Sequence, residues 1–266
     1  MAAVTIRIGH SADPDDAFMA WAFEAGILDT RGLDFELVAS DIQTLNQWAV
    51  EGRLEVTALS AGAYPAVADR YLLLPHGASF GEGYGPIVVS PDELSLDELR
   101  EVEIATPGAL TTATRVLKRA LGDVATRDLS FDAILDEVTS GRARAGLLIH
   151  EGQLTYAEHG LHKLLDLGVW WRDETGLPLP LGVVAARRDI ERPQDVSAVI
   201  REAIDAGLAN RDEAMRFAMT FGRGINAKTA DQFVEMYVND LTLDMGEQGR
   251  AALALLLDAE PEFVAG

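Results

Sequence analysis

Cysteine is absent from the 266-residue chain. Its absence excludes disulfide bonds, thiol catalysis, iron–sulfur clusters and zinc sites built on cysteine. Positive charge is also scarce, since 22 lysine and arginine residues stand against 43 aspartate and glutamate residues, for a formal net charge of −21. Because the few basic residues do not cluster, neither nucleic acid nor an anionic membrane is an expected partner.

Long apolar runs and targeting signals are missing as well. No run approaches the roughly 18–20 apolar residues that cross a bilayer. The N-terminal residues lack the basic segment followed by an apolar segment that marks a secretory signal. We therefore expect a cytoplasmic protein.

Nucleotide-binding and zinc-protease fingerprints are not found either. The sequence has no Walker A, Gly-x-Gly-x-x-Gly or His-Glu-x-x-His pattern, and the loop Gly81–Pro86 resembles the second without the strand and helix that should flank it. We therefore expect no nucleotide cofactor.

Short apolar segments alternate with helical ones along the chain, which is typical of an α/β protein. With 48% hydrophobic residues, the chain can form one large domain or two small ones. The order of the elements predicts two lobes: a discontinuous large α/β lobe from residues 1–90 and 184–266, and a small inserted α/β lobe from residues 91–183. A cleft between lobes is a preferred place for a small-molecule site.

One apolar run ends in a histidine. Ala145–Ile149 is predicted to be a buried strand of a parallel sheet, with His150 at its carboxyl end. Ligands of open α/β sheets bind at the carboxyl ends of strands, and a neutral imidazole is well suited to proton transfer near neutral pH. His150 is therefore the candidate catalytic residue, with a buried structural histidine as the alternative.

The segment Ser11–Phe18 follows the first predicted strand and is rich in acid. Ser11 or Asp13 can cap the following helix, and Asp15 and Asp16 complement its dipole. Capping is one interpretation; the other is that a carboxylate or the Ser11 hydroxyl binds substrate hydroxyls. No histidine or further acid stands nearby at ligand spacing, so no metal is expected.

A second strand-to-helix junction, Pro107–Ala113, combines a proline–glycine turn with Thr111 and Thr112 in the first helical turn. Free backbone N–H groups at a helix N-terminus form an anion site. The expected ligand is a carboxylate, and a merely capped helix is the alternative.

Ser60 ends another predicted strand. Ala58 stands where a nucleophile elbow has its first glycine, which favours a hydrogen-bonding role for Ser60 over a nucleophilic one. Asn46 lies on the preceding predicted helix and by itself indicates a structural role. His10, at the end of the first predicted strand, is a further candidate to face the cleft.

These segments together resemble the 1,4-dihydroxy-6-naphthoate synthases of the futalosine route to menaquinone. The resemblance covers nearly the whole chain, and the segments that carry it are specific only in combination: Ser11–Phe18, Thr44–Leu54, Leu59–Ser60, Gly85–Pro86, Pro107–Gly108, Thr111–Ala113, Ala145–Glu151, Thr155–Tyr156, Asp166–Gly168, Trp170–Trp171 and Thr175–Gly182.

The resemblance implies a fold like that of type II periplasmic binding proteins, with two lobes hinged around a central cleft. It also implies conversion of cyclic dehypoxanthinyl futalosine to 1,4-dihydroxy-6-naphthoate and dihydroxyacetone without a redox cofactor. The family histidine matching His150 is the proposed base, and the positions matching Asn46, Ser60, Thr112 and Ala113 line the pocket.

In the expected complex, the small-molecule substrate places its carboxylate at the 107–113 helix N-terminus, where Thr111 and Thr112 donate. Asp16, Asn46 and Ser60 are expected to hold its hydroxyls.

The chain departs from the family at two positions in the acidic segment. Ala12 stands where the family often has proline, and Asp15 where it can carry asparagine, whereas the acid matching Asp16 is kept. Two other functions stay open: a solute-binding protein for a small carboxylate, and chorismate dehydratase of the same pathway. A monomer and a homodimer are both compatible with the sequence.

Overall fold

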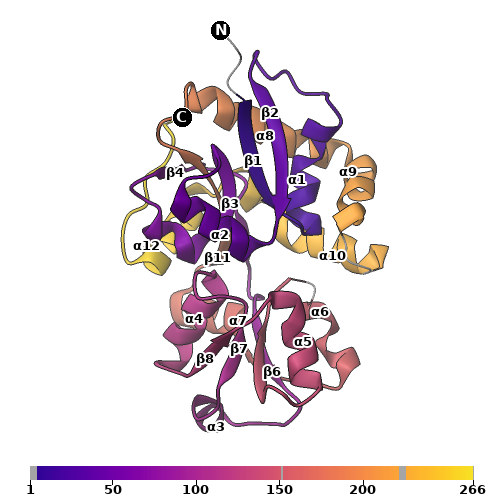
Figure 1. Cartoon of the computed structure of the whole chain (residues 1–266), viewed down its shortest axis with the longest axis vertical. Helices are drawn as coiled ribbons and strands as arrows, with labels where there is room; N and C mark the ends of the chain where they lie inside the picture. The colour runs from indigo at the N-terminus through magenta and orange to yellow at the C-terminus, as the bar shows by residue number, and fades with distance from the viewer. Residues whose placement is uncertain (1–4, 151, 222–225, 266) are drawn as a thin grey trace.

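The strand β3 (Val56–Ser60) shows how an apolar run becomes the centre of a sheet, since every one of its residues is buried. It lies between β1 (Thr5–Ser11), with which it pairs in parallel, and β11 (Leu179–Arg187), with which it pairs antiparallel. The computed structural model, shown in Figure 1, describes residues 5–150, 152–221 and 226–265.

The first sheet has the order β2-β1-β3-β11-β4, and β5 pairs with β11 beside this path. Its outer strands are β2 (Asp34–Ser40), β4 (Tyr71–Leu73) and β5 (Ser79–Gly81). The helices that belong to this part of the chain are α1 (Pro14–Glu24), α2 (Ile42–Glu51), α8 (Pro193–Ala209), α9 (Arg211–Ala218), α10 (Ala227–Tyr237), α11 (Asp240–Leu243) and α12 (Gly246–Leu257).

The second sheet has the order β10-β6-β9-β7-β8. With its helices it forms the lower body of the molecule in Figure 1, and the first sheet with its helices forms the upper body. Its strands are β6 (Ile87–Ser90), β7 (Ile104–Thr106), β8 (Thr126–Asp128), β9 (Ala145–Leu148) and β10 (His162–Asp166). Its helices are α3 (Leu96–Arg100), α4 (Thr112–Leu121), α5 (Phe131–Thr139), α6 (Gly152–Thr155) and α7 (Leu167–Thr175).

The predicted α/β class is confirmed, and the strands form two sheets. The chain passes from the first sheet to the second between β5 and β6, and returns through α7 to β11. The lobe boundaries expected at 90/91 and 183/184 stay a prediction. In the strand pairing, β6 belongs to the second sheet and the whole of β11 belongs to the first.

One hydrophobic cluster extends through both sheets. It includes Leu59 and Val183 of the first sheet, Val88 and Leu147 of the second, and Trp171 of α7. The two sheets therefore share a packed interior beside the crossing segments. Within the described ranges, none of the helices is both long and apolar enough to cross a bilayer.

The strand before the candidate histidine differs from its prediction in two ways. β9 pairs in parallel with β7 but antiparallel with β6, so the sheet is mixed and not parallel. The strand also ends at Leu148, and His150 has a φ of 53°, in the left-handed region. Non-glycine residues enter that region only at a cost in free energy. The chain turns at His150, which is therefore a turn residue and not the last residue of the strand.

Candidate active site

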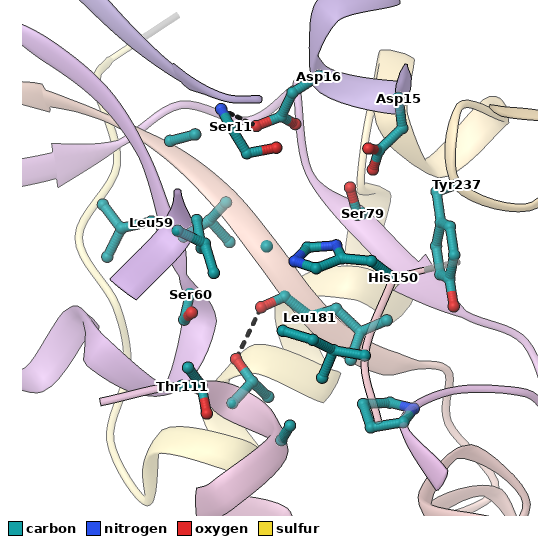
Figure 2. Close-up of a pocket in the computed structure, with 18 of the residues that line it drawn as sticks. Ser11, Asp15, Asp16, Leu59, Ser60, Ser79, Thr111, His150, Leu181 and Tyr237 are labelled. Carbon is teal, nitrogen blue, oxygen red and sulfur yellow. Dashed lines mark hydrogen bonds between the residues drawn. The ribbon is translucent and has the colours of Figure 1, made fainter. Parts of the chain in front are cut away.

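A pocket of about 100 Å³ lies where the two bodies meet. It is bounded by the ends of β1 and β3, the N-termini of α1 and α4, the β9–α6 connection, the first half of β11, and α10. Figure 2 shows polar side chains from both bodies directed into it.

His150 is the only imidazole among the residues that line this pocket in the described part of the chain. Its side chain is 16% exposed, and its Nδ1 lies 3.3 Å from Oδ2 of Asp13, which is 1% exposed. Phe131 packs edge-on against the ring at a centroid distance of 5.0 Å, and Phe233 lies at 6.4 Å. Nε2 is buried and has no hydrogen-bond partner among the described residues, so this nitrogen is available to a ligand.

Asp13 occupies the N-cap position of α1, but its side chain makes no capping hydrogen bond, and Ser11 does not cap the helix either. The capping interpretation is therefore wrong for both side chains. The carboxylate of Asp13 instead faces the ring of His150 across the pocket edge.

Asp16 and Asp15 reach the pocket from the first turn of α1. Asp16 Oδ2 accepts a hydrogen bond of 2.8 Å from the Ser11 backbone N–H, which fixes the carboxylate at the end of β1. Asp15 is 8% exposed, and its Oδ1 is buried without a partner among the described residues. Burial, together with the charges of Asp16 and Asp13, raises the pKa of Asp15 well above its ordinary value.

Ser60 lines the pocket, whereas Asn46 is fully buried behind it and does not. The Ser60 backbone N–H donates to Asn46 Oδ1 over 2.8 Å, and Asn46 Nδ2 donates to Ser60 Oγ over 3.0 Å. These two hydrogen bonds fix Ser60, so Asn46 acts on a ligand through Ser60 in this arrangement.

Thr111, Thr112 and Ala113 line the opposite side of the pocket at the start of α4. Thr111 is the N-cap, and its hydroxyl donates to Gly108 O and accepts from Thr114 N. Both threonine hydroxyls are thus engaged within the protein, since Thr112 Oγ1 also has two partners.

Thr112 Oγ1 donates to Leu181 O over 2.7 Å and accepts from the Gly62 N–H over 2.9 Å. A Cβ on Gly62 would lie 3.1 Å from Thr112 Cα, so glycine allows the two backbones to approach this closely. The backbone N–H groups of Thr112 and Ala113 stand at the first two helical positions, where no carbonyl of the helix can accept them. These amides, rather than the hydroxyls, are the donors that an anion would meet.

Several pocket residues are not indicated by any local sequence pattern. Ser79 comes from β5, Gln153 from α6, and Phe233 and Tyr237 from α10. The Tyr237 hydroxyl donates to Gln153 Oε1 over 3.0 Å and thereby joins the C-terminal helices to the second body. Only the fold brings these distant segments together.

His10, a sequence candidate for the cleft, is buried beside the pocket. It does not line the pocket but a smaller apolar cavity next to it, with Nδ1 2.9 Å from Ser11 O and its ring edge-on to Phe221. Within the described ranges, no three His, Asp or Glu side chains are grouped so that they could hold a metal ion.

Known proteins similar to this chain identify its family. A family model described as menaquinone biosynthesis matches residues 6–261. A curated protein of Thermus thermophilus named 1,4-dihydroxy-6-naphtoate synthase is 38% identical over 97% of this chain and 94% of its own length. A Streptomyces coelicolor protein of the same name is 33% identical over 97% of this chain and 93% of its own length.

Solved structures show the same fold. An Archaeoglobus fulgidus protein superposes with a TM-score of 0.90 at 45% identity, covering 96% of each chain. The ligand-binding component of an ABC-type import system of Staphylococcus aureus superposes with a TM-score of 0.70 at 12% identity, covering 97% of this chain and 94% of its own. The latter confirms the expected periplasmic-binding-protein-like fold. On the match over residues 6–261 and the two curated relatives, this chain belongs to the menaquinone biosynthesis family.

Proposed function

We propose that this chain is a carbon–carbon lyase that converts cyclic dehypoxanthinyl futalosine to 1,4-dihydroxy-6-naphthoate and dihydroxyacetone. The names of the two curated relatives support this reaction. The observation that carries it is the buried Nε2 of His150, which faces the pocket while Asp13 lies against Nδ1.

His150 acts as the general base. With its proton on Nδ1, directed toward the Asp13 carboxylate, the imidazole presents the lone pair of Nε2 to the pocket. Nε2 takes the proton of a substrate hydroxyl, and a retro-aldol-type cleavage follows. General-base catalysis of this kind supplies roughly 10²–10⁴-fold in rate.

The remaining polar groups orient the substrate. Its carboxylate lies at the N-terminus of α4, where the amides of Thr112 and Ala113 and the positive end of the helix dipole favour an anion. The sugar-derived hydroxyls lie near Asp16 and near Ser60, which Asn46 holds in place. This orientation separates the anionic end of the substrate from the acidic turn of α1.

A product assay tests the proposal. Purified protein with cyclic dehypoxanthinyl futalosine and no added cofactor should release naphthoate and dihydroxyacetone in equal amounts. His150→Ala should lower kcat by roughly 10²–10⁴-fold. His159→Ala, which removes an exposed imidazole a few residues away, should leave kcat unchanged. An inactive wild type, or a fully active His150→Ala variant, contradicts the proposal.

The fold similarity to an importer's binding component favours one competing function, capture of a small carboxylate without chemistry. Calorimetry that shows binding of the substrate with no turnover would support that alternative. Chorismate, assayed side by side, tests dehydratase activity. A cytoplasmic location fits the enzyme better than the importer component, and it stays a prediction.

A further inference from the structure

The turn that carries His150 is held by the first body at two points. His150 has a φ of 53°, and a histidine keeps this left-handed conformation only where its surroundings stabilise it. One point is the contact of its Nδ1 with Asp13. The other is Tyr237 of α10, whose hydroxyl donates to Gln153 Oε1 over 3.0 Å. The first contact orients the imidazole, and the second reaches the same turn through a different side chain.

Gln153 and His150 are joined within this turn. The Gln153 backbone N–H donates to His150 O over 3.2 Å, at the start of α6. Both residues line the pocket. The helix α6 has four residues, and a helix of this length has little stability of its own. Its position, and with it the position of His150, therefore depends on contacts from outside the helix.

The helix α10 offers Tyr237 as a fixed donor for this contact. Tyr237 is 2% exposed, and its ring packs edge-on against Tyr84 at 5.6 Å and against Phe233 at 4.8 Å between centroids. Tyr84, in the connection between β5 and β6, donates its hydroxyl to Met236 O and so anchors the end of α10. Burial raises the pKa of Tyr237, so its hydroxyl keeps its proton and can donate.

On the basis of the proposed function, we propose that Tyr237 is a positioning residue for the base. Through Gln153 it holds the start of α6 where Nε2 of His150 meets the substrate hydroxyl, and Tyr237 itself transfers no proton. A base must lie within about 2.6–3.2 Å of the atom whose proton it takes. A displaced turn therefore lowers the rate even when the substrate still binds at α4 and Ser60, which belong to other elements.

The kinetic test is Tyr237→Phe, which removes the hydroxyl and keeps the ring that packs on Tyr84 and Phe233. Its kcat on cyclic dehypoxanthinyl futalosine should fall by roughly 10–10²-fold, with a smaller change in KM. Tyr71→Phe is the matched control, because it also loses a buried hydrogen bond, to Leu54 O over 2.7 Å, and Tyr71 does not line the pocket. The control should keep the wild-type kcat. A folded Tyr237→Phe variant with wild-type kcat overturns the assignment.

A second substitution tests whether Tyr237 acts through Gln153. Gln153→Met keeps the length of the side chain and removes the oxygen that accepts the hydrogen bond. It should lower kcat by about as much as Tyr237→Phe does, and the double variant should be no slower than either single variant, because both break the same contact. Losses that multiply in the double variant would show that the two side chains act independently, and would overturn the assignment.

Nitrogen NMR of the His150 ring separates this inference from the proposed function, because it needs no turnover. The ring signals are assigned by their loss in His150→Ala. At a pH where the ring is neutral, wild type should show one tautomer, with the proton on Nδ1 facing Asp13, and Tyr237→Phe should show a mixture of both.

Identical ring signals in wild type and Tyr237→Phe overturn the positioning role, even if the enzyme is active. Changed ring signals together with a wild type that leaves cyclic dehypoxanthinyl futalosine intact contradict the proposed function instead. In that case Tyr237 still positions the imidazole of His150, and the site serves another reaction.

Discussion

Nδ1 of His150 lies 3.3 Å from Oδ2 of Asp13, a contact between residues 137 positions apart in sequence that belong to different bodies of the molecule. Asp13 ends the connection after β1 and His150 lies in the turn after β9. The contact fixes which ring nitrogen faces the pocket, because a carboxylate at Nδ1 favours the tautomer with its proton there. The base of the proposed reaction is therefore assembled where the two bodies meet.

Replacing Asp13 with asparagine tests this relationship. The amide is close in shape to the carboxylate but does not stabilise the imidazolium that forms when Nε2 takes a proton. We expect Asp13→Asn to lower kcat on cyclic dehypoxanthinyl futalosine by roughly 10²-fold, with KM changing less. Steady-state kinetics beside Asp123→Asn, an exposed aspartate, provide the comparison. An Asp13→Asn enzyme with wild-type kcat would show that the contact does not serve catalysis.

Asp15→Asn should change how stability depends on pH. Because the pKa of Asp15 in the folded protein lies above its ordinary value of 3.8, the folded protein keeps a proton that the unfolded chain has released. Stability from this group is complete below pH 3.8 and is lost as the pH rises toward the folded-state pKa. Asparagine has no such dependence, so the melting temperature of Asp15→Asn relative to wild type should increase across this window. Thermal melts at a series of pH values measure it, and a difference that does not vary with pH contradicts the prediction.

Thr112→Val should destabilise the junction between the bodies. Valine keeps the shape but removes the hydroxyl that bridges the Gly62 N–H and the Leu181 carbonyl. An unsatisfied buried group costs about 1–3 kcal/mol, and we expect a loss of that size in the free energy of unfolding by urea. Thr112→Ser keeps the hydroxyl and should recover most of it. Equal stability of the valine and serine variants would argue against the bridge.

Asn46→Ala should weaken substrate binding without touching the pocket surface. It removes the partner of both the Ser60 N–H and the Ser60 hydroxyl, so Ser60 loses its fixed orientation. We expect KM to rise and the free energy of unfolding to fall by about 1–3 kcal/mol. Asn210→Ala, which removes an exposed amide, is the control. A KM that stays at the wild-type value would show that Ser60 does not need this support.

Local pattern was sufficient for the elements but not for every side chain. The strand predicted over Ala145–Ile149 is present as β9 over Ala145–Leu148, and its residues are buried as the apolar run predicts. A helix start was also predicted within Pro107–Ala113, and in the structure Thr111 is the N-cap of that helix. The Thr111 and Thr112 hydroxyls were expected to bind the ligand directly, but in the structure both have partners within the protein. The direction in which a side chain points is not encoded in the local sequence.

By itself, the sequence determined the α/β class, the apolar strands, the position of His150 after β9 and, through its resemblance, the family. The tertiary structure alone decided that Asp13 faces His150, that Asn46 lies behind Ser60, and that α10 contributes Tyr237 to the pocket. The physical reason is distance along the chain. Periodicity and capping reflect neighbours within a few residues, whereas these contacts, and the burial that raises the pKa of Asp15, exist only once segments from opposite ends of the chain exclude water from one pocket.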